Sequence, residues 1–177
     1  MSPRGDLYNE QIRAETLSKI TSAALEVFAE YGYNGATMKQ IAKATGFSYG
    51  LVYHYFPSKE KIFCSLVDLA LESSLSTIEA GLNVIGTAWK KLNSLSALII
   101  KNALTGESSF YFLIMMQALT QGKSIPGLLD YIGERSRVHY EKLVPVIIKA
   151  QKEGAAAKGD PIVLTAAYFS FIQGLAF

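Results

Sequence analysis

The sequence predicts an all-α protein: a three-helix head that contains a helix-turn-helix, followed by a larger helical body. Three observations point to this class. Apolar residues return every three or four positions along most of the chain, which is helical spacing. Ser, Thr or Pro starts many of these segments and Gly ends several of them, as helix boundaries require. Half of the 177 residues are apolar, so a buried core is readily built.

The first helix is expected from about Asn9 to Tyr31, after a loose polar arm over residues 1–8. Gly32 follows the last apolar position and is expected to end the helix. The apolar stripe of this helix should form the floor on which the helix-turn-helix packs. Its members are Ile20, Ala24, Val27, Phe28 and Tyr31.

Residues 37–56 read as two short helices joined by a tight turn. Thr37 is a predicted N-cap, and Gln40 is placed to return the hydrogen bond in a capping box. Gly46 can adopt the left-handed conformation that ends a helix, and Ser48 is a new N-cap shortly after it. Helices joined this closely cross at a steep angle, as in a helix-turn-helix. The predicted buried positions of the first helix are Met38, Ile41 and Ala42.

The second of these helices has two different faces. Val52 and Phe56 are four residues apart and can dock on the preceding helix, while Gly50 and His54 point the opposite way. Leu51, Tyr53 and, in the first turn, Tyr49 flank the outer face. Gly permits close approach to a partner, and tyrosine hydroxyls and imidazole can hydrogen-bond phosphates or base edges. The pattern therefore favours DNA binding, although a small helical hairpin with exposed aromatic residues also fits it.

Four runs with unbroken spacing resemble the TetR family of bacterial transcriptional repressors. They are residues 23–33 (AALEVFAEYGY), 37–42 (TMKQIA), 46–48 (GFS) and 52–60 (VYHYFPSKE). The resemblance covers residues 9 to about 75, which is far more specific than an isolated helix-turn-helix. It implies a homodimer that binds double-stranded DNA at a palindromic operator.

The resemblance also implies which residues touch DNA, because several positions match the family motif. Lys59 corresponds to a phosphate contact in this comparison. Pro57 departs from the family pattern, since many members have a lysine, arginine or glycine there. The implied DNA-binding residues are Thr37, Lys39, Ser48, Tyr49, Gly50, Leu51, Tyr53, His54, Tyr55 and Lys59.

Charge agrees with a modest DNA affinity. The formal net charge is only +2, but between Tyr33 and Lys59 the chain carries lysines and no acidic residue. The field over the helix-turn-helix is therefore mildly positive. We expect weak non-specific DNA binding with a modest dependence on salt.

The head is assigned to residues 9–57, with a linking helix from Ser58 that continues it to about residue 75. The body is assigned to residues 58–177. Within it we expect helices over residues 58–80, 87–104, 108–119, 128–153 and 161–177. Trp89 should point inward, the 108–119 helix should be surrounded by others because it is apolar nearly all round, and Pro145 should kink its helix.

Aromatic and methionine residues of the body suit a pocket for a hydrophobic or amphipathic small molecule, with plain core packing as the alternative. The resemblance raises the expectation of a cavity without identifying its lining. The candidate pocket residues are Trp89, Asn102, Phe110, Phe112, Met115, Met116, Gln117, Tyr140 and Tyr168.

The segment Pro161–Phe177 has no charge and cannot face water as a lone surface helix. One side should pack on the body and the other on the same helix of a second subunit. The candidate dimer residues are Leu164, Tyr168, Phe171, Ile172 and Leu175. Because the sequence stops at Phe177 without a cap or polar tail, we expect the body to be incomplete there and the natural chain to continue.

Enzymatic signatures are not found. Gly122-Lys123-Ser124 is not a phosphate-binding loop, because Gln117 occupies the position where such a loop has its first glycine. The two histidines do not cluster with acidic residues or with Cys64 at the spacing of metal ligands. We therefore expect no enzymatic activity, no metal and no cofactor. A single cysteine, a polar start and no apolar run of ~20 residues predict a cytoplasmic protein without a membrane anchor.

Together these observations predict a TetR-like repressor that releases its operator when a small molecule enters the body. The alternative is a helical small-molecule-binding or adaptor protein without sequence-specific DNA binding.

Overall fold

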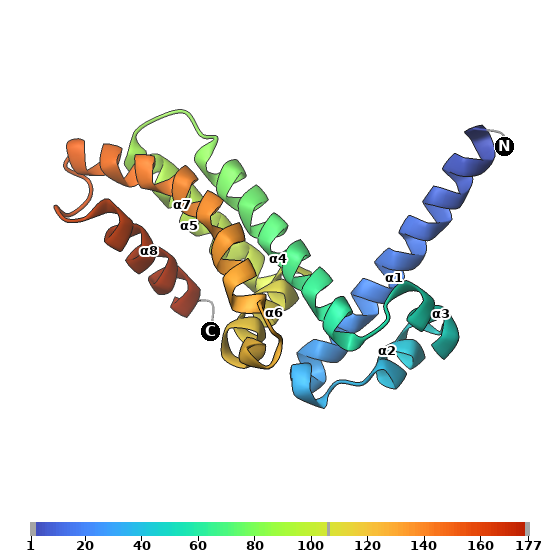
Figure 1. The fold of residues 1–177 in the computed structure, drawn as a ribbon. Coiled ribbons are helices and arrows are strands. Elements are labelled where there is room, and N and C mark those ends of the chain that lie inside the picture. The colour runs from blue at the N-terminus through green and yellow to red at the C-terminus, as the bar shows by residue number, and fades with distance from the viewer. Residues whose placement is uncertain (1–2, 106, 176–177) are drawn as a thin grey trace. The chain divides into compact units, whose positions relative to one another are not determined.

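The computed structural model describes residues 3–105 and 107–175, and within these ranges the chain is helical with no strand (Figure 1). The all-α prediction is confirmed. In chain order the elements are α1 (Pro3–Gly35), α2 (Met38–Thr45), α3 (Tyr49–Tyr55), α4 (Lys59–Leu82), α5 (Ala88–Leu104), α6 (Glu107–Gln121), the short 3₁₀ helix η1 (Gly122–Ser124), α7 (Leu128–Lys152) and α8 (Pro161–Leu175).

The chain divides into two compact units. We call residues 1–68 and 113–128 the head unit, and residues 69–112 and 129–177 the body unit. The head unit thus contains the start of α4, and it also takes in residues 113–128. The start of α4 stays with the head because Ile62, Phe63 and Leu66 are buried there, and the ring of Phe63 lies 5.2 Å from that of Phe28.

α1 is longer than predicted, because the residues expected to form a loose arm are helical from Pro3 onward. Proline is tolerated in the first turn of a helix, where its missing N–H would have no partner. Ile20 and Phe28 are buried as predicted, but Tyr31 is exposed. Gly32 turns the backbone (φ 68°, ψ 167°), so Tyr33 is the residue that enters the core.

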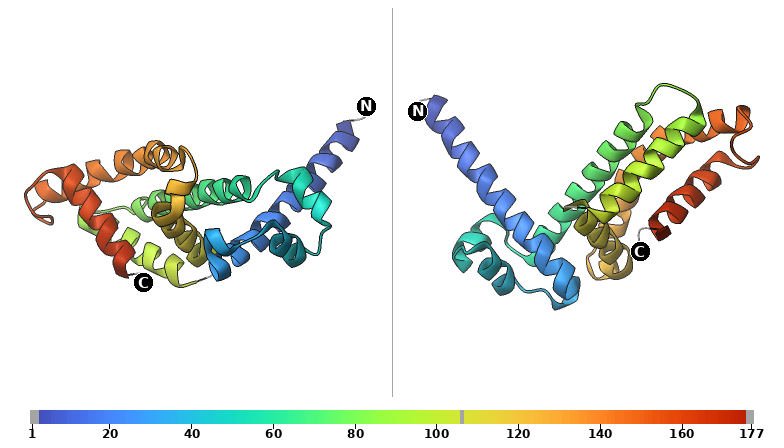
Figure 2. Two further views of the ribbon diagram at one scale, coloured as in Figure 1. Left: turned by 60° about the horizontal axis from the view of Figure 1, so that its bottom comes forward. Right: turned by 180° about the vertical axis from the view of Figure 1, so that it is seen from behind.

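The predicted helix-turn-helix is present, and α2 and α3 lie beside α1 in all three views (Figures 1 and 2). Thr37 caps α2 by accepting a hydrogen bond from the Gln40 N–H, and Ser48 caps α3 in the same way from Leu51. Gly46 ends α2 in the left-handed conformation (φ 70°), where a side chain would be strained. The Thr37 hydroxyl donates to Gln40 Oε1 at 2.6 Å, so the Gln40 side chain accepts from this hydroxyl rather than from the Thr37 backbone N–H as in a capping box.

α6 is less enclosed than its composition suggests. Ile114 and Ala118 are buried, but Leu113 and Leu119 are exposed. The prediction of a helix surrounded on all sides is therefore wrong for this chain taken alone. An apolar helix lacks a polar face that would indicate which side meets water.

In the body unit, α4 and α5 form an antiparallel pair. A Cβ atom added at Gly81 would lie 2.6 Å from Leu95 Cα, so the two backbones approach through this glycine. Farther along, Asn102 Nδ2 donates to Thr77 Oγ1 at 3.0 Å. The buried core around this crossing contains Ile78, Ala88, Leu92, Leu95, Leu143, Ile147 and Ala150.

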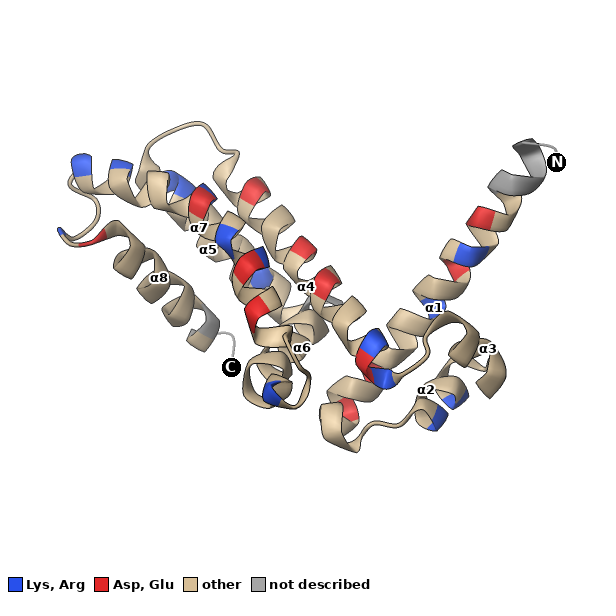
Figure 3. Cartoon of the chain, in the orientation of Figure 1, with Lys and Arg blue, Asp and Glu red and all other residues tan. Residues whose placement is uncertain are grey.

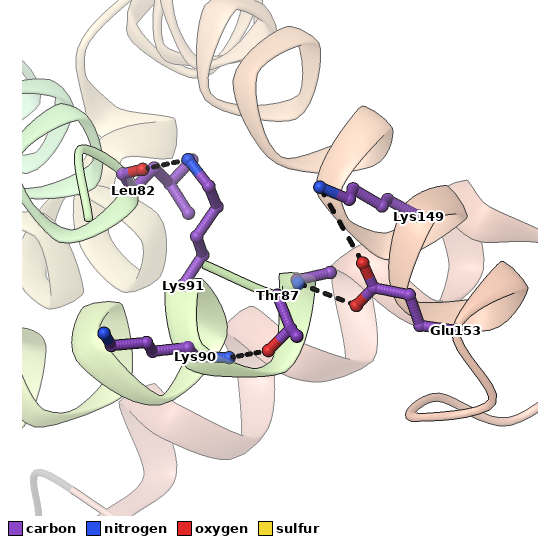
Figure 4. Close-up of polar contacts among 7 residues, drawn as sticks. Leu82, Thr87, Lys90, Lys91, Lys149 and Glu153 are labelled. Atoms are coloured by element: carbon purple, nitrogen blue, oxygen red, sulfur yellow. Dashed lines mark hydrogen bonds and ion pairs between the residues drawn. The ribbon is translucent and has the colours of Figure 1, made fainter. Parts of the chain in front are cut away.

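The connection between α4 and α5 is held by polar contacts to helix ends (Figure 4). Lys91 Nζ donates to the Leu82 carbonyl at 2.6 Å, and Thr87 caps the start of α5. From the end of α7, Glu153 Oε2 accepts a hydrogen bond of 2.8 Å from the Ala88 N–H. Cations at helix C-termini and carboxylates at N-termini satisfy groups that otherwise lack partners.

α4 and α7 run in the same direction through the body unit. Glu72 pairs with Arg135 at 3.7 Å and, farther along both helices, Glu79 pairs with Lys142 at 2.7 Å. These ion pairs are about half exposed, so each adds little stability. His139 lies between Arg135 and Lys142 on α7, is buried, and has its pKa lowered by that burial.

Candidate nucleic-acid interface

The outer face of α3 presents the residues that the sequence predicts for DNA reading. Val52 is fully buried against the head, so the helix has one fixed orientation. Tyr49 and Tyr53 are 52% and 38% exposed, and Leu51 is also exposed. A Cβ atom added at Gly50 would meet nothing within 4 Å, which leaves open space beside this position. The face is accessible to a flat or grooved partner.

Tyr49 and Tyr53 form a pair on this face. Their hydroxyl oxygens lie 3.0 Å apart and share a hydrogen bond, and their ring centroids are 4.6 Å apart. The hydrogen bond with Tyr49 raises the pKa of Tyr53, so its hydroxyl stays protonated at neutral pH. Because the Tyr49 hydroxyl donates to the Tyr53 oxygen, the Tyr53 hydroxyl can direct its own proton to a phosphate.

The remaining α3 candidates differ in exposure. His54 is exposed and its ring meets that of Tyr55 edge to face at 5.5 Å. Tyr55 is half-buried, so it presents less of its surface than Tyr53 does. Ser48 contributes its hydroxyl to the N-cap of α3. This cap fixes the end of the helix at which Tyr49 and Gly50 lie.

α2 adds positive charge to the same part of the head. Lys39 and Lys43 are exposed on α2, the helix that carries blue in Figure 3, and neither α2 nor α3 shows any red there. Thr37, at the start of α2, is also exposed but uses its hydroxyl for the cap. The exposed lysines can neutralise phosphates on either side of a groove that α3 enters.

Lys59 does not face outward as the family motif implies. Its ammonium donates to the carbonyl oxygens of Tyr33 at 2.9 Å, Ala36 at 3.0 Å and Asn34 at 3.4 Å. It also lies 4.8 Å from the centroid of the Tyr33 ring. The predicted phosphate contact is thus corrected: the three N–H donors of this side chain are directed at backbone carbonyls.

Sequence reasoning missed two residues beside Lys59. The Tyr33 hydroxyl donates to Glu60 Oε1 at 3.2 Å. Burial and the Glu60 carboxylate raise the pKa of Tyr33 to about 12, while hydrogen bonds from Ser58, its own backbone N–H and Tyr33 hold the pKa of Glu60 below its ordinary value. One sequence signal was available, since the last turn of α1 has no basic residue of its own.

The candidate pocket residues are divided between the two units. Met115, Met116 and Gln117 belong to the head unit, where Gln117 Nε2 donates to the Phe28 carbonyl of α1 at 2.8 Å. This bond joins α6 to the helix that supports α2 and α3. Oε1 of Gln117 is buried and has no hydrogen-bond partner among the described residues.

The body unit holds the other candidates, and they differ in environment. Tyr168 packs on the core and its hydroxyl lies 2.8 Å from Ser96 Oγ. Tyr140 meets Phe169 edge to face at 5.8 Å.

Trp89 is 58% exposed, so its predicted inward position is wrong for the single chain. It lies in the first turn of α5, where Ala88 takes the buried position instead. Asn102 bonds Thr77 as described above, and Phe110 and Phe112 are half-buried.

α8 has an exposed apolar side. Phe171 is 66% exposed, with Ile162 and Val163 similarly open. Ile172 is only 5% exposed and therefore packs on its own chain, which corrects its predicted place in a dimer contact. Leu164 and Tyr168 also pack against the body core. The side chain of Leu175 lies outside the described residues.

In the described part of the chain, no group of three or more His, Cys, Asp or Glu side chains is placed to hold a metal ion. Among the same residues, no helix combines the length and apolarity that crossing a bilayer requires.

Comparison with known proteins places residues 20–66 in the sequence profile described as "Bacterial regulatory proteins, tetR family". The transcriptional repressor AcnR of Corynebacterium efficiens is 46% identical over 48 residues, 27% of this chain and 26% of the repressor. The fatty acid metabolism regulator protein of Bacillus subtilis is 28% identical over 141 residues, 80% of this chain and 71% of the regulator. The match thus spans about a quarter of the length of the first curated relatives, such as AcnR, and 71% of the length of the fatty acid metabolism regulator.

Solved structures share the helical fold over most of this chain. The TetR family regulator PfmR from Thermus thermophilus has a TM-score of 0.75 at 24% identity, over 89% of this chain and 82% of that one. The transcriptional regulator FadR from Bacillus subtilis, solved in complex with stearoyl-CoA, has a TM-score of 0.70 at 26% identity, over 90% and 84%. The first likeness supports the fold alone.

Proposed function

Since the chain belongs to the TetR family of bacterial transcriptional regulators, we propose that it is a homodimeric repressor that binds a palindromic operator and is released by an amphipathic effector. The observation that carries DNA binding is the outer face of α3. It joins a glycine with open space beside it to a pair of tyrosine hydroxyls, next to the exposed lysines of α2. An acid-free, mildly basic surface of this kind favours nucleic acid over protein partners.

The proposed roles follow from the chemistry of each side chain. Tyr49, Gly50 and His54 read base edges or permit close approach, and Tyr53 donates to phosphate. Lys39 neutralises phosphate from α2. Thr37 and Ser48 position the two helices through their caps, and Leu51 and Tyr55 supply apolar contact area.

The dimer is supported by the exposed apolar side of α8. Phe171, Ile162 and Val163 lie on a helix without any charged residue, and such a surface is stabilised by a second copy packing on it. Two heads related by a two-fold axis would read half-sites about 34–36 Å apart, or multiples of this distance, which requires a palindromic operator.

For the effector we propose a long-chain acyl compound, of the kind present in the FadR complex as stearoyl-CoA. The chemistry available in this chain supports an apolar tail. In the body unit the aromatic side chains of Phe110, Phe112 and Tyr140 are only half-buried. Apolar and aromatic side chains are the usual lining of sites that bind an apolar ligand.

The test measures binding of the protein to the DNA upstream of its own gene by fluorescence anisotropy. We expect specific binding, at least ~10³-fold tighter than to a scrambled duplex of equal length. Stearoyl-CoA should release the DNA, whereas coenzyme A alone should not. Linkage requires the operator to weaken stearoyl-CoA binding by the same factor.

The two parts of the proposal fail separately. Equal affinity for operator and scrambled DNA would refute sequence-specific repression. Acyl binding in that case would favour a small-molecule-binding protein or adaptor. Specific DNA binding that no acyl compound alters would refute the effector class alone.

A further inference from the structure

Lys59 is a basic residue of the DNA-binding head whose charge is directed inward. We propose that Lys59, with Tyr33 and Glu60, is a positioning residue: it latches the end of α1 to the start of α4 and thereby sets the orientation of α2 and α3 for DNA. This inference rests on the proposed DNA-binding function and replaces the phosphate contact that the family motif implies for Lys59. We call the three side chains the latch.

The first step concerns the end of α1. The last carbonyls of an α-helix have no partner within the helix, and the C-terminus carries partial negative charge. Basic residues in the last turn commonly satisfy these groups, but α1 has none there. Lys59 supplies the cation from 26 residues farther along the chain, at 2.9 Å from the Tyr33 carbonyl.

The second step concerns the geometry around the ammonium. It has three N–H donors, and the carbonyls of Tyr33, Asn34 and Ala36 lie within 3.4 Å of the nitrogen. The ring of Tyr33 faces the same cation at 4.8 Å. A phosphate could reach Lys59 only by replacing these contacts. Lys39 and Lys43 need no such exchange because they are exposed on α2.

The third step concerns Tyr33 itself. Its side chain is 5% exposed, its ring lies 4.7 Å from that of Phe63 on α4, and its hydroxyl donates to Glu60. Tyr33 is therefore fixed by α4 through ring, hydroxyl and carbonyl together. A residue buried to this degree cannot contact DNA.

The latch joins the two ends of the segment that contains α2 and α3. Residues 37–57, which contain α2 and α3, lie between Ala36 and Lys59 in the chain, and the Ala36 carbonyl accepts from Lys59 Nζ at 3.0 Å. Both ends of the helix-turn-helix are thus held at one point. Loss of this point should let α2 and α3 shift without unfolding α1 or α4, whose aromatic contacts remain.

The experiment compares Lys59→Met with Lys39→Met, which removes the same charge and keeps a similar stem. Operator affinity is measured from 50 to 200 mM salt, at a temperature where circular dichroism shows each variant folded. Lys39→Met should lower the slope of log K against log[salt] by about 0.9 per copy, as one lost phosphate contact does. Lys59→Met should weaken binding about tenfold at every salt concentration, with less than half that change in slope.

A milder variant guards against loss of folding, and a measurement on the free protein tests the latch without DNA. Tyr33→Phe removes only the hydroxyl bond to Glu60 and should weaken operator binding with no change in slope. Amide hydrogen exchange of the free protein should become faster in α2 and α3 for Lys59→Met, but not for Lys39→Met.

Equal slope changes for the two lysine variants would overturn the proposal in favour of direct phosphate contact. Unchanged affinity and unchanged amide exchange in Lys59→Met would also overturn it. If the wild-type protein shows no preference for any upstream DNA, the proposed function fails, and amide exchange alone decides whether the latch orders α2 and α3.

Discussion

Replacing Gly50 by alanine should move stability and DNA affinity in opposite directions. Gly50 is exposed near the start of α3, does not adopt the left-handed backbone conformation, and has no atom within 4 Å of an added Cβ. Alanine therefore fits the free protein. Glycine costs a helix about 0.5–1 kcal/mol relative to alanine, so Gly50→Ala should stabilise the protein by up to that amount. For a chain of this size the melting temperature should rise by about 1–4 °C.

The same methyl group would occupy the open space that we assign to the DNA groove. Loss of close approach should weaken operator binding at least about tenfold, the equivalent of ~1.4 kcal/mol, and change which bases are preferred. Thermal unfolding followed by circular dichroism gives the first quantity. Fluorescence anisotropy with the operator and single-base variants of it gives the second.

Gly133→Ala is a matched control. Gly133 is also exposed within a helix, α7, and an added Cβ would meet nothing within 4 Å. Its replacement should raise the melting temperature similarly and leave operator affinity unchanged. If Gly50→Ala keeps both affinity and base preference, α3 does not read DNA through this face, and the assignment of the outer face is wrong.

Four further outcomes are expected. Tyr53→Phe should weaken specific and non-specific DNA alike in anisotropy titrations, because a lost phosphate contact carries no sequence information; a changed base preference would contradict this. Phe171→Glu should give monomers in sedimentation at micromolar concentration, with the head still folded, whereas a wild-type monomer would exclude the dimer. Gly81→Ala should destabilise the protein by about 1–3 kcal/mol in urea unfolding, because the Leu95 backbone must move; an unchanged midpoint would show that α4 and α5 separate easily. Burial lowers the pKa of His139, so the unfolded state takes up its proton first and stability should fall as pH drops below about 6.5; a His139→Gln variant should lose this part of the pH dependence, and an identical pH profile would assign it elsewhere.

Features of the head that depend on neighbouring residues were predicted well from the sequence. Thr37 and Ser48 cap their helices, and Gly46 ends α2, because each of these roles is decided within a few residues. The burial of Val52 followed from its helical phase relative to Gly50. Short-range chemistry leaves little freedom at such positions.

Features that depend on distant contacts were not predicted. Lys59 looks like a surface lysine in sequence, and only the fold brings the end of α1 to it. Ile172 and Phe171 are both large and apolar on a helix without charge, so no polar side indicates which of them faces solvent. Trp89 lies outside the core because the turn before α5 gives that place to Ala88.

The single junction formed by Tyr33 and Lys59 has a consequence for exchanging DNA specificity between regulators. If residues 37–57 alone were transplanted, they would carry the DNA-reading surface, but the contacts between the end of α1 and Lys59 would come from the host protein. A transplant that begins before Tyr33 and ends after Glu60 would also carry the hydrogen bonds that hold both ends of the helix-turn-helix. The segment that can be exchanged as one unit is therefore wider than the helix-turn-helix, and its ends lie outside Tyr33 and Glu60, where the end of α1 contacts the start of α4.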